Sequence, residues 1–169
     1  MLPNFIIAGA PKAGTTSLYH YLSEHPEVFM SDPKEVNFFS KEEIDAQGLY
    51  YDIFKAGNIS EYKKLFINAN GKKAVGEASV SYLYYQEVPQ KIKRIIPDAK
   101  IIIALRSPVE RAFSHYLMDL RLGYIELSFE DVVYKRVEHK YLNLYYQQYV
   151  ELGFYFEQVR RYIKCFGEG

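Results

Sequence analysis

NFIIAGAPKAGTTSLYHY, residues 4–21, carries a short apolar run that breaks into a glycine-containing turn and then into a helical pattern. Residues 4–8 predict a buried strand, because the run is apolar and is followed by a turn signal. Residues 15–24 predict a helix with Tyr21 facing inward. The helix ends at Glu24, because His25 precedes Pro26 and the residue before a proline leaves the helical region. The first unit is therefore a strand, a turn and a helix.

The turn in this unit has the spacing of a phosphate-binding loop with one change. A P-loop has the pattern GxxxxGK[ST], and Gly9 and Gly14 occupy its two glycine positions. Thr15 stands where the pattern has lysine, and the lysine lies at Lys12 instead. Backbone N–H groups and the positive end of a helix attract anions. Residues 12–17 therefore predict an anion site whose chemistry differs from that of a P-loop kinase or nucleoside triphosphatase.

A second anion site is indicated after the apolar run at residues 100–105. Arg106 follows this run, and Ser107 begins a capping-box pattern with proline at the first helical position. Arg111 and Ser114 follow Ser107 at i+4 and i+7, so the three side chains share one face of the predicted helix. An arginine beside a helix start is often only a surface charge, but here it accompanies the first site.

The remaining patterns predict an alternation of strands and helices. Strands are expected at residues 28–30, 73–77 and 100–105, and helices at residues 60–66, 89–96, 108–122, from 128 onward and at 154–166. This alternation is typical of a parallel sheet covered on both faces. We therefore predict an α/β fold, a P-loop-like three-layer αβα sandwich with a central parallel sheet, forming a single domain over residues 1–169. Ligands of such sheets bind beyond the carboxyl ends of the strands.

Composition restricts the class of protein further. The chain has 169 residues, 49% of them hydrophobic, and it balances 21 basic against 21 acidic residues. A net charge of +0 gives no broad surface for nucleic acid. The sequence has one cysteine, no apolar run long enough to span a membrane and no signal peptide. We expect a cytoplasmic protein without a disulfide framework.

Two segments carry a family resemblance. APKAGTTSLYHYL (residues 10–22) resembles the 5′-phosphosulfate loop, and IIALRSPVERAFSHYL (residues 102–117) the 3′-phosphate loop, of sulfotransferases that use 3′-phosphoadenosine-5′-phosphosulfate, PAPS. Three further blocks look like those of the bacterial and heparan-type branch: LSEHPEVFMSDPKEVNFFS, GEASVSYL and GFYFEQVRRYI. The five blocks follow in order and cover nearly the whole chain.

The resemblance implies a role for each matching residue. PAPS would be the sulfuryl donor and adenosine 3′,5′-bisphosphate, PAP, the product, and the family needs no metal. The implied nucleotide-binding residues are Lys12, Ala13, Gly14, Thr15, Thr16, Ser17, Arg106 and Ser114. Lys12 would contact the phosphosulfate and neutralise charge on the departing phosphate oxygen.

An acceptor also needs a base to remove its proton. The resemblance implies Glu35, which matches the glutamate that acts as base in heparan-type relatives. Glu77 ends a predicted strand and competes with Glu35, and His115 is a further alternative that is more often structural on a mixed helix face. Ala78 occupies a position where heparan-modifying relatives commonly carry lysine, which argues against heparin-like acceptors.

Members of the family usually continue beyond the helix matched at residues 154–166, so the C-terminal part is expected to be missing, either by truncation or in a naturally short member. An exposed sheet edge would favour association with another copy. The leading hypothesis is an enzyme that transfers sulfuryl from PAPS to a hydroxyl, or less readily an amine, of a carbohydrate, lipid or small molecule. The alternative is a catalytically incomplete nucleotide-binding or assembly module of the same fold.

Overall fold

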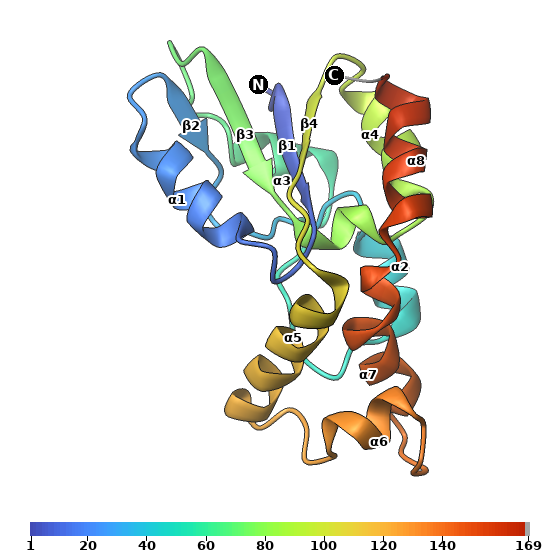
Figure 1. The fold of residues 1–169 in the computed structure, drawn as a ribbon. Coiled ribbons are helices and arrows are strands. Elements are labelled where there is room, and N and C mark those ends of the chain that lie inside the picture. The colour runs from blue at the N-terminus through green and yellow to red at the C-terminus, as the bar shows by residue number, and fades with distance from the viewer. Residues whose placement is uncertain (168–169) are drawn as a thin grey trace.

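Four parallel strands form the central sheet of the computed structural model, which describes residues 1–167 (Figure 1). The strands are β1 (Phe5–Gly9), β2 (Val28–Met30), β3 (Ala74–Ala78) and β4 (Lys100–Ile103), and their order across the sheet is β2-β3-β1-β4. Phe5 pairs with Gly76 on one side and with Lys100 on the other. Glycine is required at Gly76, because a Cβ there would lie 2.2 Å from the Phe5 ring.

The helices follow the predicted alternation, with two additions. They are α1 (Thr15–Glu24), α2 (Lys41–Gln47), α3 (Ile59–Lys64), α4 (Val88–Ile95), α5 (Pro108–Leu122), α6 (Phe129–Val133), α7 (Leu142–Tyr149) and α8 (Tyr155–Phe166), with 3₁₀ turns η1 (Val80–Leu83) and η2 (Glu151–Gly153). The bounds predicted for α1 and α5 are confirmed. The sequence predicts neither α2 nor α7, because each is about two turns long and lacks a clear apolar period.

Helices cover both faces of the sheet and so confirm the three-layer architecture. Ile7 of β1 packs with Leu18 of α1 on one face. Ile6, the preceding residue, points to the other face and belongs to the same cluster as Ile92 of α4 and Tyr162 of α8. Figure 1 shows α1 on one side of the strands and α4 and α8 on the other, with α5, α6 and α7 beyond the carboxyl ends of the strands.

The expectation that Tyr21 faces inward is wrong. Tyr21 is 72% exposed, whereas Tyr19 is partly buried and donates a hydrogen bond from its hydroxyl to the Ser31 carbonyl at 2.8 Å. The cause is the narrow contact of α1, which meets only one face of a small sheet. Tyr19, Leu18 and Leu22 cover that face, so the helix turns Tyr21 toward solvent.

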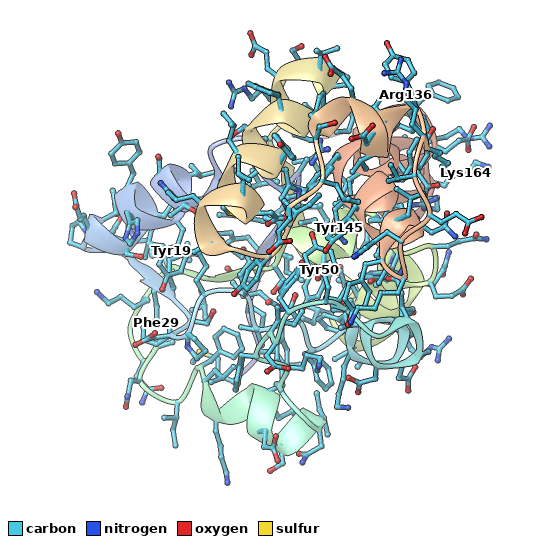
Figure 2. The ribbon with its side chains drawn as sticks, turned by 90° about the horizontal axis from the view of Figure 1, so that it is seen from below. Tyr19, Phe29, Tyr50, Arg136, Tyr145 and Lys164 are labelled. Atoms are coloured by element: carbon cyan, nitrogen blue, oxygen red, sulfur yellow. The ribbon has the colours of Figure 1, made fainter. Side chains whose placement is uncertain are left out.

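A second hydrophobic core, rich in tyrosine, lies beyond the carboxyl ends of the strands (Figure 1). The ring of Tyr50 lies close to that of Tyr145 of α7, with centroids 4.7 Å apart and planes tilted by 59°, and both residues are labelled in Figure 2. The buried carboxylate of Asp119 on α5 accepts hydrogen bonds from the hydroxyls of Tyr50 and Tyr149, at 2.5 and 2.8 Å. This core fixes α5 and α7 against the loop that follows α2, next to the carboxyl edge of the sheet.

Candidate active site

The turn before α1 has the backbone of an anion-binding loop. Its N-cap residue, Gly14, is left-handed with φ 84°, a conformation that glycine adopts without steric cost. Lys12 is left-handed as well, with φ 63°. A glycine N-cap has no side chain to occupy the first turn, and the N–H groups of Thr15, Thr16 and Ser17 have no partner within the helix. The turn therefore offers donors and a positive helix end to an anion.

Lys12 lies between this turn and α5 and is partly buried. Its Nζ is 3.3 Å from Sδ of Met118. Burial is the largest cause that lowers the Lys12 pKa; the charges of Arg121 and Arg106 lower it further, and the Asp119 carboxylate raises it. An ammonium crowded by two guanidinium groups marks a region of positive potential that favours an anion.

Two cavities meet at Lys12. One, called here the deep cavity, has a volume of about 320 Å³, and the other, the outer cavity, has a volume of about 450 Å³. Lys12 and Met118 line both. The deep cavity also contains Thr15, Thr16 and Glu35, and the outer cavity contains Arg106, Ser114 and Arg121. The structure thus brings the two predicted anion sites to either side of one lysine.

Arg106 and Ser114 face the outer cavity together, as predicted. Arg106 is exposed, and its Nε donates to Oε2 of Glu110 at 3.1 Å. Ser107 occupies the N-cap position of α5 with proline at N1, but its side chain makes no capping hydrogen bond within residues 1–167, so the predicted side-chain cap is wrong. The pair between Arg106 and Glu110, which both line the outer cavity, is an exposed contact of small energy.

Arg111 does not join this anion site, which corrects the sequence-based expectation. It is fully buried, and its Nη2 donates to the carbonyls of Gln148, at 2.8 Å, and Tyr149. The helix turns Arg111 toward α7 while Ser114 faces the cavity. Arg111 therefore links α5 to the end of α7. Arg106 lines the outer cavity with Ser114, and Arg111 does not.

His115 is buried, and its Nδ1 lies 3.1 Å from the Gln148 carbonyl oxygen. Burial lowers the His115 pKa to about 3, and the charges of Arg111 and Lys12 act in the same direction. The ring is therefore neutral at physiological pH, and it lines the deep cavity. These features fit the structural interpretation of His115 better than a role as base.

Glu35 lies at the deep cavity on a tightly held loop. Its backbone is left-handed with φ 63°, its N–H donates to the Ala78 carbonyl at 2.8 Å, and its Oε2 accepts from the Val80 N–H at 2.9 Å. Lys34 pairs with Oε1. Each carboxylate oxygen can accept more than one hydrogen bond, so both remain able to receive a proton. The end of β3 thus positions the carboxylate beside the cavity.

Glu77 lies beneath this loop and is fully buried. Its carboxylate accepts hydrogen bonds from the hydroxyls of Tyr62, Ser79 and Tyr82. Burial raises the Glu77 pKa to about 7; the three hydroxyls oppose this shift and the charge of Glu35 adds to it. Glu77 is not among the residues that line either cavity.

Some residues of the site are not predicted from the sequence. Arg121 follows Ser114 at i+7, so helix spacing from Ser114 could have indicated it. Met118, at i+4 from Ser114, lies on the same helix face. Tyr51 gives no such signal, because it reaches the deep cavity through tertiary packing. Within residues 1–167, no three His, Cys, Asp or Glu side chains come together as a possible metal site.

The parallel sheet, the glycine turn and the cavities at the carboxyl edge of the sheet define the class of P-loop-like α/β proteins. Residues 2–169 match the family of the sulfotransferase domain. The chain therefore belongs to the sulfotransferase family, and the resemblance found in the sequence is confirmed.

Individual relatives agree with this assignment. The crystal structure of a sulfotransferase from Alicyclobacillus acidocaldarius is similar with a TM-score of 0.84 and 38% identity, over 99% of this chain and 70% of that one. A membrane-associated sulfotransferase, kil1 of Dictyostelium discoideum, is 31% identical over 81% of this chain and 28% of its own length. The human bifunctional heparan sulfate N-deacetylase/N-sulfotransferase 3 is 33% identical over 68% of this chain and 13% of its own length.

The chain thus spans less than a third of these two curated relatives. Their full activities and locations are properties of longer proteins. Among residues 1–167, no helix has the length and apolar character needed to cross a membrane.

Proposed function

We propose that this chain binds PAPS and transfers its sulfuryl group to a hydroxyl of an acceptor, without a metal. The observation that carries the proposal is the position of Lys12, which lines both the cavity with Arg106 and Ser114 and the cavity with Glu35. A donor with two separate anionic groups matches two anion sites, and a lysine between them matches the point where charge develops.

The residues present fit such a donor. The open first turn of α1, with Thr15, Thr16 and Ser17, would hold the 5′-phosphate, and Ala13 and Gly14 shape the backbone that approaches it. Gly14 leaves this approach clear, because a Cβ there would meet no atom within 4 Å and the residue is exposed. Arg106 and Ser114 would hold the 3′-phosphate. The donor supplies the activated sulfuryl group, and the chain supplies its position and its charge environment.

Two side chains would act on the reacting atoms. Lys12 would place its ammonium on the oxygen that carries negative charge after the sulfuryl group leaves. Glu35 would accept the proton of the acceptor hydroxyl at a carboxylate oxygen that faces the deep cavity. The hydrogen bond from the Val80 N–H and the pair with Lys34 would hold that carboxylate in place.

For Glu77, the other carboxylate considered as base, the buried position supports a positioning role. The hydroxyl of Ser79 donates to Oε2 of Glu77 at 2.9 Å and accepts from the Asn37 N–H at 3.0 Å. Asn37 in turn donates through Nδ2 to the Glu35 carbonyl at 2.8 Å. Glu77 would thereby hold the loop that carries Glu35, and it would not touch the acceptor.

A nucleotide-binding module without turnover is the alternative function. The exposure of Arg106 and Glu110 favours it, because an open phosphate site excludes water poorly. The two functions share nucleotide binding and differ in product. Formation of a sulfated product from PAPS with any acceptor would remove the alternative.

Calorimetric titration with PAP and with ATP tests the ligand class. We expect PAP to bind more tightly than ATP without magnesium. Arg106→Ala should weaken PAP binding about 10- to 100-fold, since it removes a charged hydrogen-bond donor from the 3′-phosphate. The matched control is Arg136→Ala, an exposed arginine that stacks on Tyr134 away from both cavities. ATP binding that requires magnesium, or equal PAP affinity in Arg106→Ala and Arg136→Ala, would contradict the proposal.

The stability of the protein is expected to depend on the Glu77 proton. Because the Glu77 pKa is raised to about 7 in the folded state, the folded protein binds this proton more tightly than the unfolded chain. The stabilisation is complete below the ordinary pKa and is lost as pH rises through about 7. The loss is on the order of 3 kcal/mol.

Urea unfolding at pH 5 and pH 8 measures this effect. Glu77→Gln, which is neutral at both pH values, should show a smaller fall in the free energy of unfolding than the wild type. Glu138→Gln, at an exposed carboxyl, serves as the control and should keep the wild-type fall. The same fall in Glu77→Gln and the wild type would show that Glu77 titrates normally.

A further inference from the structure

The wall of the deep cavity is mostly apolar, and this bears on the acceptor. Its aliphatic part comes from α2, from the loop after α2, from the start of η1 and from η2: Ile44, Leu49, Ile53, Val80 and Leu152. Three aromatic rings, Tyr51, Tyr84 and Tyr85, complete it. We propose that the acceptor is a neutral molecule with an apolar body of one or two rings and a single reacting hydroxyl. This proposal rests on the function proposed above.

The polar side chains on the wall are largely occupied within the protein. Asn37 donates through Nδ2 to the carbonyls of Glu35 and Phe54, at 2.8 and 3.0 Å, and its Oδ1 accepts from Ser81 at 2.6 Å. The Ser81 hydroxyl also lies 2.8 Å from that of Ser40. The amide and the hydroxyl therefore hold the loop together, and they have little capacity left for a ligand.

Two hydroxyls of the aromatic wall are occupied in the same way. Tyr84 donates to Oε2 of Glu151 at 2.9 Å, and Tyr85 donates to Oε1 of Gln47 at 2.7 Å. The Gln147 amide pairs with Gln47. With their polar ends engaged by protein partners, these residues leave mainly ring carbon and aliphatic surface for the cavity. Such a surface gains free energy when it covers apolar area of a ligand.

The charges at the cavity do not suit an anionic acceptor. Lys34 is paired with Glu35, and Lys12 is assigned to the donor. His115 is neutral, since burial lowers its pKa to about 3. Among the lining residues that the structure describes, no further cation faces the cavity. A sulfated sugar would therefore enter a site without a free counter-charge, beside the carboxylate of Glu35.

The volume of the deep cavity and its few free hydrogen-bonding groups also favour an apolar acceptor. An apolar cavity of about 150 Å³ holds a benzene molecule, so a cavity of about 320 Å³ has room for a ring system beside the part lined by Thr15 and Thr16, which is assigned to the donor. A pyranose of similar size brings several hydroxyls. Each hydroxyl left without a partner loses its hydrogen bonds to water without replacement, which costs free energy. A sugar would lose more than it gains on this wall, whereas an aryl or alicyclic alcohol leaves one hydroxyl to meet Glu35.

A comparison of ligand affinities tests this acceptor class. Calorimetry on the PAP-saturated protein would compare 2-naphthol, N-acetylglucosamine and a sulfated glucosamine disaccharide, without turnover. We expect 2-naphthol to bind at least about tenfold more tightly than either sugar, in line with burial of one ring system. Sugar binding equal to or tighter than that of 2-naphthol would overturn the inference. Absence of PAP binding would instead contradict the proposed function.

A variant pair locates the binding. Ile53→Asp places a charge on the cavity wall and should weaken 2-naphthol binding by at least about tenfold without changing PAP affinity. The matched control is Ile67→Asp, at an isoleucine that is 66% exposed and outside the cavity. If Ile53→Asp does not fold, Leu49→Asn provides the second test. Unchanged 2-naphthol affinity in a folded cavity variant would show that the ligand binds elsewhere.

Discussion

Replacement of Lys12 by alanine is expected to lower kcat/KM for sulfuryl transfer by about 100- to 1,000-fold, because one preorganised charge at a developing anion is worth this much. Lys12 sits where the two cavities meet, beside Met118, and the crowding by Arg121 and Arg106 adds positive potential around it. The loss should fall on kcat. PAP affinity should change by less than about tenfold, since the α1 turn and Arg106 remain.

Release of PAP from PAPS, with 2-naphthol and a panel of other alcohols as acceptors, measures the rate, and calorimetry measures PAP binding. The matched control is Lys64→Ala, an exposed lysine at the end of α3. It should keep wild-type rates. If Lys12→Ala loses PAP binding and retains kcat, the lysine contributes only to binding, and its assignment to the leaving oxygen is wrong.

Replacement of Glu35 by glutamine is expected to lower kcat by about 100- to 10,000-fold, the usual contribution of a general base. Glutamine can still accept the hydrogen bond from the Val80 N–H through its amide oxygen, so the loop should stay folded. PAP affinity should stay near the wild-type value, because Glu35 belongs to the acceptor side of Lys12. Loss of rate with intact nucleotide binding separates the base from the nucleotide-binding residues.

The same assays test Glu35 against the other carboxylate. Glu138→Gln, at an exposed position, is the matched control and should be fully active. Glu77→Gln should retain more activity than Glu35→Gln, because Glu77 is fully buried and acts through Ser79 and Asn37. Wild-type turnover by Glu35→Gln would remove this residue from the mechanism, and a larger loss in Glu77→Gln would reverse the two assignments.

The sequence predicts much of the fold because its signals are local. The apolar run before Gly9 and the helix after Gly14 specify the first unit, and proline after Ser107 marks the start of α5. Short helices are harder to predict. α2 and α7 depend on contacts with other elements, such as the hydrogen bonds between Gln47 and Gln147, and such contacts have no local pattern.

Helix periodicity places residues on a face, but it does not say which neighbour that face meets. Arg111 and Ser114 appear together from the spacing, yet packing turns Arg111 into the core, where it binds the carbonyls that end α7. Tyr21 is an equivalent case on α1, since the sheet beneath it is too narrow to cover the ring.

The sequence by itself determined the glycine turn before α1, the family and the proximity of Arg106 to Ser114, since each depends on motifs whose residues lie close together along the chain. Only the tertiary structure placed Lys12 between the two cavities, buried Glu77 beneath the Glu35 loop and engaged the polar groups of the deep cavity with protein partners. These features come from residues far apart in sequence, and their charges and hydrogen bonds depend on burial, which the order of residues does not specify.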